Sequence, residues 1–513
     1  MTLDLVVVGL DGLSYNMLER FDVDSPYIES VTERGVSGDL MSTDTPTTIP
    51  AWTSFATGKD PGTHGVQTMT ELQSDYSSTP ARTNRTEAGI YDFLNESVFV
   101  NLPATKGRTP AGRETLLVSG MLARDEADAV PEELQSLASF EDYVLDHDAS
   151  LKMRPTRYFE HVEEITRARE AFAREAFETR DPRVGFVLFS TPDWAGHVLS
   201  NVSSEERRRE LYASLLEVVD ECAAGIAELA DNVVLMSDHG FEYKQTNVHL
   251  NEWLHDEGYF ETRTGGSVDF QRAALESVKA VASRSDRVLA VLRRVYNRLL
   301  GTRMGEQLTE AVSMDIDHAG AVAWQHQYGC VYVNDDRFDT PTVEDPEPLI
   351  RQLAKEMREV RADDGTPLFR EVLTAAEAYE DPEPDAPDVI ARPAQGCFPT
   401  SLSSPTGGYA SPTDNFEHRY RGMFAATGPL YDESASVMGM SIVDVLPTLL
   451  HALGHPLAPD FTGTANTEIL RTDREPTEMA YIDVPQPQFQ AESDSAVKDD
   501  VVEERLSDLG YIE

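Results

Sequence analysis

Cysteine is scarce in this sequence: the chain has three, Cys222, Cys330 and Cys397, and no two of them are close together. The absence of a CxxC pair argues against a zinc–thiolate site and a disulfide framework. Long apolar runs are missing as well, since no stretch approaches the roughly 18 to 20 residues that cross a bilayer. The first residues enter a strand-like segment with no basic leader before it. These absences predict a cytoplasmic protein without a membrane-spanning part.

Positive charge is also in short supply, because 43 lysine and arginine residues face 90 aspartate and glutamate residues, for a net charge of -47. The acidic residues are spread along the chain. This distribution is typical of a surface adapted to high salt, where charge repulsion is screened within about 3 Å at 1 M. An acidic face for a basic partner is the alternative, although no localised acidic block supports it. Either surface repels phosphate backbones and anionic lipids, so we expect no nucleic-acid or membrane partner.

Apolar segments that alternate with helical patterns indicate the fold class. Hydrophobic residues make up 40% of the chain, which is enough for a large core. Strand-like runs occupy residues 5–10, 184–189 and 233–237, and amphipathic helical patterns occupy residues 159–179 and 205–229. This rhythm predicts an α/β fold, a three-layer α/β/α sandwich with a mixed, mostly parallel central sheet and an inserted helical cap.

The same patterns suggest how the chain is divided. We assign residues 1–264 and 313–471 to one catalytic α/β core. Residues 265–312 are helical in pattern without strand signals, so we interpret them as a cap or lid insertion. Residues 472–513 are expected to form an acidic C-terminal tail with a short helix. The Pro-, Gly- and Ser-rich residues 380–415 are expected to be a loop.

Polar residues with metal-binding or nucleophilic side chains follow several of the strand-like runs or turn signals. They are Asp11, Thr48, Asp193, His197, Asp238, His239 and His418. Ligands of open α/β sheets bind beyond the carboxyl ends of the strands, so these side chains are predicted to meet there. Three aspartates, three histidines and a hydroxyl are the inventory of a two-metal hydrolytic site.

Each of these signals has an ordinary structural explanation when it is taken alone. The DxxxH spacing of Asp193 and His197 places both side chains on one face of a helix, but it also occurs by chance on surfaces. Asp238-His239-Gly240 is compatible with a simple turn after a strand. Thr48, just before an expected helix at residues 51–57, could serve only as a helix cap.

Longer segments around these residues match a known pattern. The run from Thr48 to Gly58, followed by Pro61-Gly62-Thr63-His64-Gly65, resembles the nucleophile segment of the alkaline phosphatase superfamily. It is most similar to the type I phosphodiesterase/nucleotide pyrophosphatase branch, which includes phosphomutase-like members. The segments Val8–Gly12, Pro192–His197, Ser237–Phe241, Glu417–Arg419 and Asp444–Leu450 resemble the other motifs of the branch, in the expected order.

The resemblance implies an alkaline-phosphatase-like core with two divalent metal ions, with Zn²⁺ in first place and Mn²⁺ as the alternative. Asp11, Thr48, Asp238 and His239 would hold one ion, and Asp193, His197 and His418 the other. Thr48 would attack phosphorus and form a phosphothreonine. The expected activity is hydrolysis of a small-molecule phosphoester, with a phosphodiester or pyrophosphate favoured. A phosphotransferase or phosphomutase with the same nucleophile, and a non-catalytic metal-binding scaffold, remain alternatives.

Some positions depart from the family pattern or stay open. Thr48-Ile49-Pro50-Ala51-Trp52 lacks the modifiable residue and arginine of sulfatases, which disfavours sulfatase activity. Gln67 and Thr68 stand where related nucleotide pyrophosphatases carry a phosphate-binding asparagine. Gln67 is therefore a candidate substrate-binding residue. Asn101 is another, because Asn101-Leu102-Pro103-Ala104-Thr105 resembles a substrate-side loop of the same branch. His64 is expected to be structural, holding the Pro61-Gly62 turn by hydrogen bonds. The sequence leaves the natural substrate and the oligomeric state open.

Overall fold

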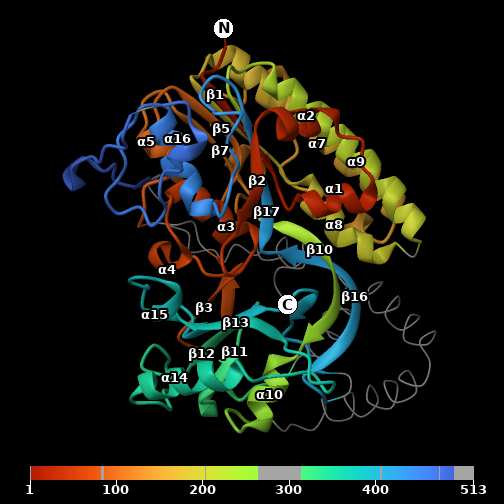
Figure 1. Ribbon diagram of the computed structural model, residues 1–513, viewed down its shortest axis with the longest axis vertical. Helices are drawn as coiled ribbons and strands as arrows, with labels where there is room; N and C mark the ends of the chain where they lie inside the picture. The colour runs from red at the N-terminus through yellow and green to blue at the C-terminus, as the bar shows by residue number, and fades with distance from the viewer. Residues whose placement is uncertain are drawn as a thin grey trace. The chain divides into compact units, whose positions relative to one another are not determined.

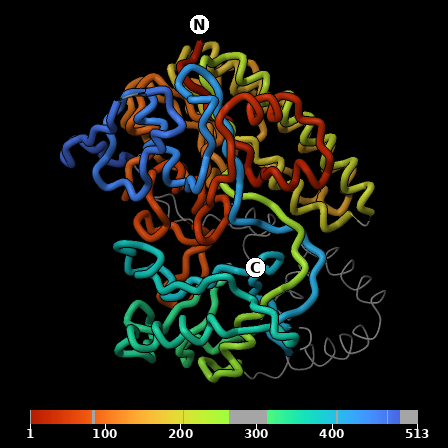
Figure 2. Tube along the Cα trace, in the orientation of Figure 1, coloured from red at the N-terminus to blue at the C-terminus, as the bar shows by residue number. Residues whose placement is uncertain are grey.

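The computed structural model describes residues 2–81, 86–202, 204–263, 314–404, 407–472 and 474–489. They form two compact units. Unit 1 takes the described residues of Met1–Met69, Ala81–Glu242 and His418–Glu504; unit 2 takes those of Thr70–Pro80 and Tyr243–Glu417. The chain passes between the units several times, so red N-terminal and blue C-terminal segments run together in unit 1 (Figure 2). The predicted cap at 265–312 lies outside the described residues.

A seven-stranded sheet forms the centre of unit 1 (Figure 1). In spatial order its strands are β2 (Val36–Met41), β17 (Arg421–Thr427), β9 (Val233–Met236), β1 (Leu5–Leu10), β8 (Val184–Phe189), β5 (Ser97–Pro103) and β7 (Leu116–Gly120). The strands from β9 to β7 pair in parallel, whereas β17 is antiparallel to both β9 and β2. The prediction of a mixed, mostly parallel sheet is confirmed.

Helices cover both faces of this sheet and complete three layers (Figure 1). One face carries α1 (Tyr15–Phe21), α2 (Pro26–Arg34), α7 (Pro155–Arg180) and α9 (Glu205–Ala227). The other carries α3 (Thr48–Thr57), α5 (Ile90–Phe93) and η5 (Ile442–Asp444) leading into α16 (Val445–Ala452). Short elements complete unit 1: α4 (Pro61–His64), β6 (Arg108–Thr109), α6 (Glu126–Ala129), η1 (Ala138–Asp142), η2 (Ala149–Leu151), α8 (Thr191–Val198), η3 (Leu199–Asn201), η6 (Thr467–Ile469), η7 (Tyr481–Asp483) and β18 (Gln488–Phe489).

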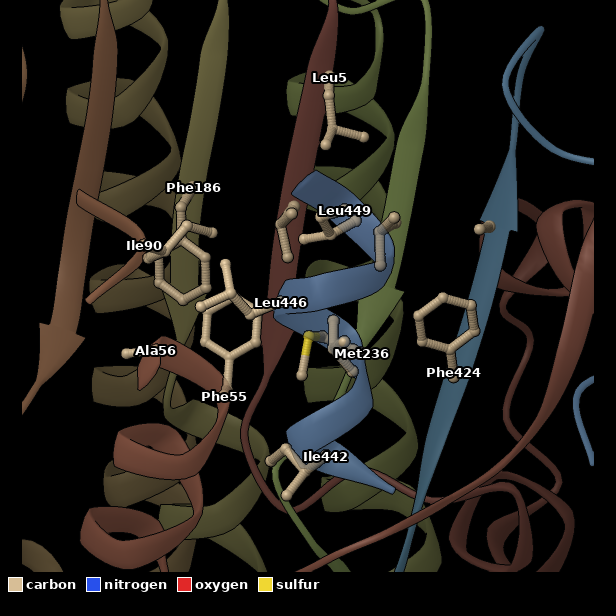
Figure 3. Close-up of a cluster of buried hydrophobic side chains, with 14 of the residues drawn as sticks. Leu5, Phe55, Ala56, Ile90, Phe186, Met236, Phe424, Ile442, Leu446 and Leu449 are labelled. Carbon is tan, nitrogen blue, oxygen red and sulfur yellow. The ribbon is translucent and has the colours of Figure 1, made fainter. Parts of the chain in front are cut away.

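The core under α3 and α16 explains why the sequences of the parallel strands are continuous apolar runs. All six residues of β1 are buried, because the sheet is covered on both sides. Side chains alternate between the faces, and Leu5 belongs to the cluster with Phe55 of α3 and Leu446 of α16 (Figure 3). This packing fixes the strands and therefore the position of the residues that follow them.

Unit 2 has smaller sheets of its own. An antiparallel sheet has the order β11 (Ala323–Gln325), β12 (Cys330–Val333), β14 (Val389–Pro393) and β13 (Phe369–Thr374). A second sheet has the order β15 (Cys397–Pro399), β10 (Gly240–Val248) and β16 (Ala410–Arg419), and β10 and β16 include residues of both units. The remaining elements are β3 (Thr70–Leu72), β4 (Ser78–Pro80), α10 (Leu250–Asp256), η4 (His318–Gly320), α14 (Pro346–Met357) and α15 (Ala375–Ala378).

Residues 380–415 and the C-terminal residues from 472 onward differ from each other in how they match the sequence expectations. The loop expected over residues 380–415 was wrong, because β14, β15 and most of β16 lie there. These strands are short and sit between Pro- and Gly-rich turns, so their composition conceals pairing with strands far away in the chain. Of the predicted tail, residues 474–489 contain η7 and β18, and β18 pairs with β6. The rest of the tail lies outside the described residues.

A membrane span was not found among the helices that could be described, since none combines sufficient length with sufficient apolar character.

Candidate metal-binding active site

The ends of the central strands bring the predicted site residues to one edge of the sheet. Asp11 directly follows β1, and Asp238 and His239 follow β9 after one intervening serine. β1 and β9 are parallel and in register, with Gly9 opposite Met236, so their carboxyl ends coincide. His418 comes just before β17, whose antiparallel direction puts its start at the same edge. The sheet topology thus gathers residues that are more than 400 positions apart.

A short helix supplies two more of the side chains. β8 ends at Phe189, and α8 begins at Thr191 with Pro192 in its first turn. Proline is compatible with this position because the first helical N–H groups have no partner within the helix. Asp193 and His197 are one turn apart on α8 and project from the same face, as their DxxxH spacing predicts.

Asp193, His197 and His418 form a compact group. The Nε2 atoms of His197 and His418 are 3.0 Å apart. Asp193 Oδ1 lies 3.6 Å from His197 Nε2 and 3.2 Å from His418 Nε2. Ligands that surround a zinc ion tetrahedrally at its usual bond lengths lie about 3.3 Å from one another. The three donor atoms therefore already have the mutual spacing that one metal ion requires.

The second group lies around His239. Its Nε2 atom is 3.6 Å from Asp11 Oδ1 and 3.2 Å from Asp238 Oδ2. The backbone N–H of Gly12 donates to the other Asp238 oxygen at 3.1 Å, which fixes that carboxylate. Asp11, Asp193 and His239 also have donor atoms within 4.8 Å of one another, so the two groups are adjacent.

The electrostatics of the site follow from burying several carboxyl groups together. Burial raises the pKa of Asp11 well above its usual value, and the negative charges of Asp238 and Asp193 raise it further. Burial likewise raises the pKa of Asp238, to about 7. Burial lowers the pKa of His197 to about 3 and that of His239 well below its usual value. His197 and His239 are therefore neutral and able to bind metal, and a cation would stabilise the carboxylates.

Phe241 encloses the histidines and had no role in the sequence prediction. Its ring centroid lies 4.9 Å from that of His197 and 5.1 Å from that of His418, both nearly perpendicular. The ring is fully buried. Phe241 follows His239 by two positions in an extended segment. Because every second side chain of such a segment points the same way, this spacing could have placed Phe241 beside His239. It forms an apolar wall that limits access of water to the imidazoles.

Thr48 is the first residue of α3, not the residue before the helix as expected, because the helix begins at Thr48 with Thr47 as its N-cap. The Thr48 hydroxyl is buried and has no hydrogen-bond partner among the described residues. It therefore does not act as a helix cap. Trp52, one turn after Thr48 in α3, packs against Gly9 of β1. The approach is so close that a Cβ added at Gly9 would lie 2.8 Å from the Trp52 ring. Thr48 is on that same side of α3.

The two predicted substrate-binding residues have partners within the protein. Gln67 donates from its side-chain amide to the Pro61 carbonyl at 2.6 Å. Asn101 donates to the Ser190 hydroxyl at 3.4 Å and accepts from the Tyr143 hydroxyl at 3.2 Å. Their role toward a substrate stays a prediction.

The donor set fits divalent metal ions. Imidazole and carboxylate together suit Zn²⁺ and Mn²⁺. Buried polar atoms normally have partners, yet Thr48 Oγ1, Asp238 Oδ2 and His239 Nε2 have no hydrogen-bond partner within the described part of the chain. A bound cation would satisfy such atoms, so the residues present are compatible with a two-metal centre.

Three solved structures are similar to this chain over most of its length. Phosphonoacetate hydrolase from Sinorhizobium meliloti, in complex with phosphonoacetate, has 14% identity and a TM-score of 0.51, covering 88% of this chain and 95% of that one. The alkaline phosphatase PafA has 14% identity and a TM-score of 0.49, with 92% and 99% of the two chains covered. Human ectonucleotide pyrophosphatase/phosphodiesterase 5 has 13% identity and a TM-score of 0.47, with 92% and 100% covered.

At the level of sequence, comparison with curated proteins gave no match. A family model described as type I phosphodiesterase / nucleotide pyrophosphatase matches residues 5–397, a range that includes each candidate site residue except His418. The chain belongs to the type I phosphodiesterase/nucleotide pyrophosphatase family of the alkaline phosphatase superfamily.

Proposed function

We propose that this protein is a two-metal phosphohydrolase that cleaves a small-molecule phosphodiester or pyrophosphate through a phosphothreonine at Thr48. Family membership supports a phosphohydrolase of the alkaline phosphatase superfamily. The observation that carries the finer proposal is the pair of adjacent Asp/His groups at one edge of the central sheet, in which every member except the half-buried His197 is buried. Neutral imidazoles and clustered carboxylates in such a place serve metal-assisted displacement at phosphorus.

The metal ligands divide into two sets. Asp11, Thr48, Asp238 and His239 would hold one ion, and Asp193, His197 and His418 the other, with Zn²⁺ favoured over Mn²⁺. When bound, the two ions supply positive charge for the phosphate oxygens and favour the deprotonated form of a hydroxyl or water.

The chain's own residues account for the covalent steps. Thr48 Oγ1 forms a bond to phosphorus while the bond to the leaving oxygen breaks, and the proton lost by the threonine hydroxyl ends on the leaving group, which departs as an alcohol or phosphate. A water molecule then breaks the Oγ1–phosphorus bond, releasing phosphate or a phosphomonoester and restoring the threonine. The first turn of α3 assists, because the backbone N–H groups at a helix N-terminus attract anions. Phe241 excludes water from one side of the imidazoles.

The test replaces the proposed nucleophile by alanine and compares the effect with that of the same replacement at a neighbouring threonine. Thr48→Ala should lower kcat/KM for an aryl phosphodiester by roughly 10³-fold or more, because it removes the attacking atom. Metal content by elemental analysis should remain near that of the unmodified protein, since the other proposed ligands stay in place. Thr53→Ala is the matched control, because Thr53 is buried in the same helix and its hydroxyl donates to the Ile49 carbonyl. Full turnover by Thr48→Ala would exclude the mechanism.

Substrate class is tested with a panel in high salt. Aryl phosphodiesters and nucleotide pyrophosphates should be cleaved faster than aryl phosphomonoesters, with Zn²⁺ and Mn²⁺ compared in parallel. A clear preference for monoesters would contradict the proposed substrate class while leaving the nucleophile assignment in place.

A further inference from the structure

A buried arginine lies behind the helix that carries Asp193 and His197. Arg169 projects from the middle of α7 and has only 1% of its surface exposed. Its hydrogen-bond acceptors among the described residues are backbone carbonyls and a serine hydroxyl. Its burial lowers the pKa of the guanidinium, against the effect of Tyr143, Asp146 and Asp11. A buried guanidinium is costly unless its donors are satisfied. Nε has no hydrogen-bond partner among the described residues, so the bonds of Nη1 and Nη2 indicate the role of Arg169.

The guanidinium connects the end of β8 with a neighbouring loop. Nη1 donates to the Leu188 carbonyl at 3.1 Å and to the Ser190 hydroxyl at 3.2 Å. Nη2 donates to the carbonyls of Val144 and Leu145, at 3.4 Å and 3.1 Å. A lysine could not reach all four acceptors at once, because its three donors lie on one atom.

Ser190 is the residue at which β8 becomes α8. It is the N-cap of α8, and its carbonyl accepts the N–H of Trp194 at 3.2 Å. Its hydroxyl also accepts from Asn101, which in turn accepts from Tyr143. Asn101 has a φ of 64° and lies within a register shift of β5. Asparagine tolerates this left-handed conformation. The irregularity turns the Asn101 side chain out of the alternation of the strand.

The same arginine also touches α8 directly. Its guanidinium carbon is 5.6 Å from the centre of the Trp194 ring, in a cation–π contact. Trp194 lies between Asp193 and His197 in sequence, so the contact acts on the turn that carries both. We call Arg169, Ser190, Asn101 and Tyr143 the Arg169 network.

We propose that Arg169 is a positioning residue that, through Ser190 and Trp194, fixes α8 and so holds Asp193 and His197 at metal-binding distance from His418. This inference rests on the proposed metal centre. Residues behind a metal site that orient its ligands commonly change metal affinity by 10- to 100-fold when they are removed, roughly the scale expected here.

The test measures Zn²⁺ affinity by competition with a chromophoric chelator, in high salt. Ser190→Ala removes one hydroxyl from the network and should weaken one of two bound Zn²⁺ ions by about tenfold or more. Arg169→Lys should weaken the same ion further. His197→Ala, which deletes a proposed ligand, identifies which ion is affected. The melting temperature of each metal-free variant separates loss of positioning from loss of folding.

Ser97→Ala is the matched control, because Ser97 is a buried serine that shares a single side-chain hydrogen bond with Thr115 at the start of β5. It should leave both Zn²⁺ affinities unchanged. Equal affinities in Ser190→Ala and the unmodified protein, or an equal loss in Ser97→Ala, would overturn the inference. If Arg169→Lys does not fold, the Zn²⁺ affinity of Ser190→Ala still tests the inference. An unmodified protein that binds fewer than two Zn²⁺ ions would instead contradict the proposed metal centre.

Discussion

His64 is a buried histidine whose hydrogen bonds require the neutral ring. Nδ1 accepts from the Val66 N–H at 3.1 Å, and Nε2 is 2.9 Å from the Ser54 hydroxyl. These bonds join His64 to Ser54 of α3 and to Val66, whereas the sequence led us to expect that it holds the Pro61-Gly62 turn. Burial lowers the pKa of His64 to about 3, against about 6.5 in an unfolded chain. The unfolded state therefore binds the extra proton between these values, and stability is lost as pH falls from about 6.5 toward 3.

The expected slope of this loss is about 1.4 kcal/mol of unfolding free energy per pH unit from this one group. His64→Gln should lower stability at pH 7 but give a shallower decline between pH 7 and pH 5. Chemical denaturation across that range measures both slopes. Parallel slopes for His64→Gln and the unmodified protein would show that His64 is not the titrating group. Other buried histidines contribute to the total slope, so the difference between the two proteins is the relevant quantity.

Individual site residues were predictable where a strand end or a helical spacing fixed them. Asp11 and the Asp238-His239 pair follow apolar runs, and Asp193 and His197 have i, i+4 spacing, so local sequence carried their placement. Arg169 had no such signal. Arginines occur throughout α7, and only the packing of α7 against the end of β8 makes this one buried. The partners of Gln67 and Asn101 were equally hidden, since they depend on turns and bulges far from regular patterns.

At the scale of elements, the approach of β17 to β9 depends on a glycine. A Cβ at Gly422 would be 2.3 Å from Ser237 Oγ and 3.0 Å from the His239 carbonyl oxygen. Ser237 cannot easily move, because its buried hydroxyl accepts the Met423 N–H at 2.8 Å. We expect Gly422→Ala to destabilise the protein by roughly 1–3 kcal/mol, as overpacking does, and to weaken Zn²⁺ binding by displacing His239.

Thermal unfolding and the chelator competition described above measure the two effects. Gly320→Ala is the control, because the added Cβ would meet only the flexible end of the Asp317 side chain, at 3.2 Å. It should change neither quantity appreciably. Normal Zn²⁺ affinity in a destabilised Gly422→Ala would show that His239 is held independently of β17.

The main elements were predictable because each large strand is a continuous apolar run between helices. The short strands β14 and β15 were not, because their stability comes from partners such as β12 and β10 that lie far away in sequence. A Pro- and Gly-rich composition describes the turns around them and conceals the pairing. The same reason explains why the seven-stranded order, with β17 inserted between β2 and β9, could not be read from the chain.

At the scale of the whole molecule, the described residues form two compact units. Unit 2 takes a short hairpin segment, Thr70–Pro80, together with the long segment Tyr243–Glu417. Within it, Tyr76 of the hairpin stacks on Phe338 and His318, with ring centroids 5.3 Å and 5.8 Å apart. A division that interleaves distant segments leaves no linker of distinctive composition, so composition alone could not locate it.

The net charge of -47 gives the last prediction. Repulsion between the many carboxylates destabilises the folded state most when salt screens it weakly. The Debye length, over which charges act, falls from about 8 Å at 0.15 M salt to about 3 Å at 1 M. The melting temperature should therefore rise as KCl increases over this range. Replacing exposed glutamates of α7, in the triple variant Glu160→Gln, Glu164→Gln and Glu178→Gln, should raise stability at low salt and reduce the salt dependence. A melting temperature that is independent of KCl, or unchanged salt dependence in the triple variant, would show that repulsion between surface carboxylates does not limit stability.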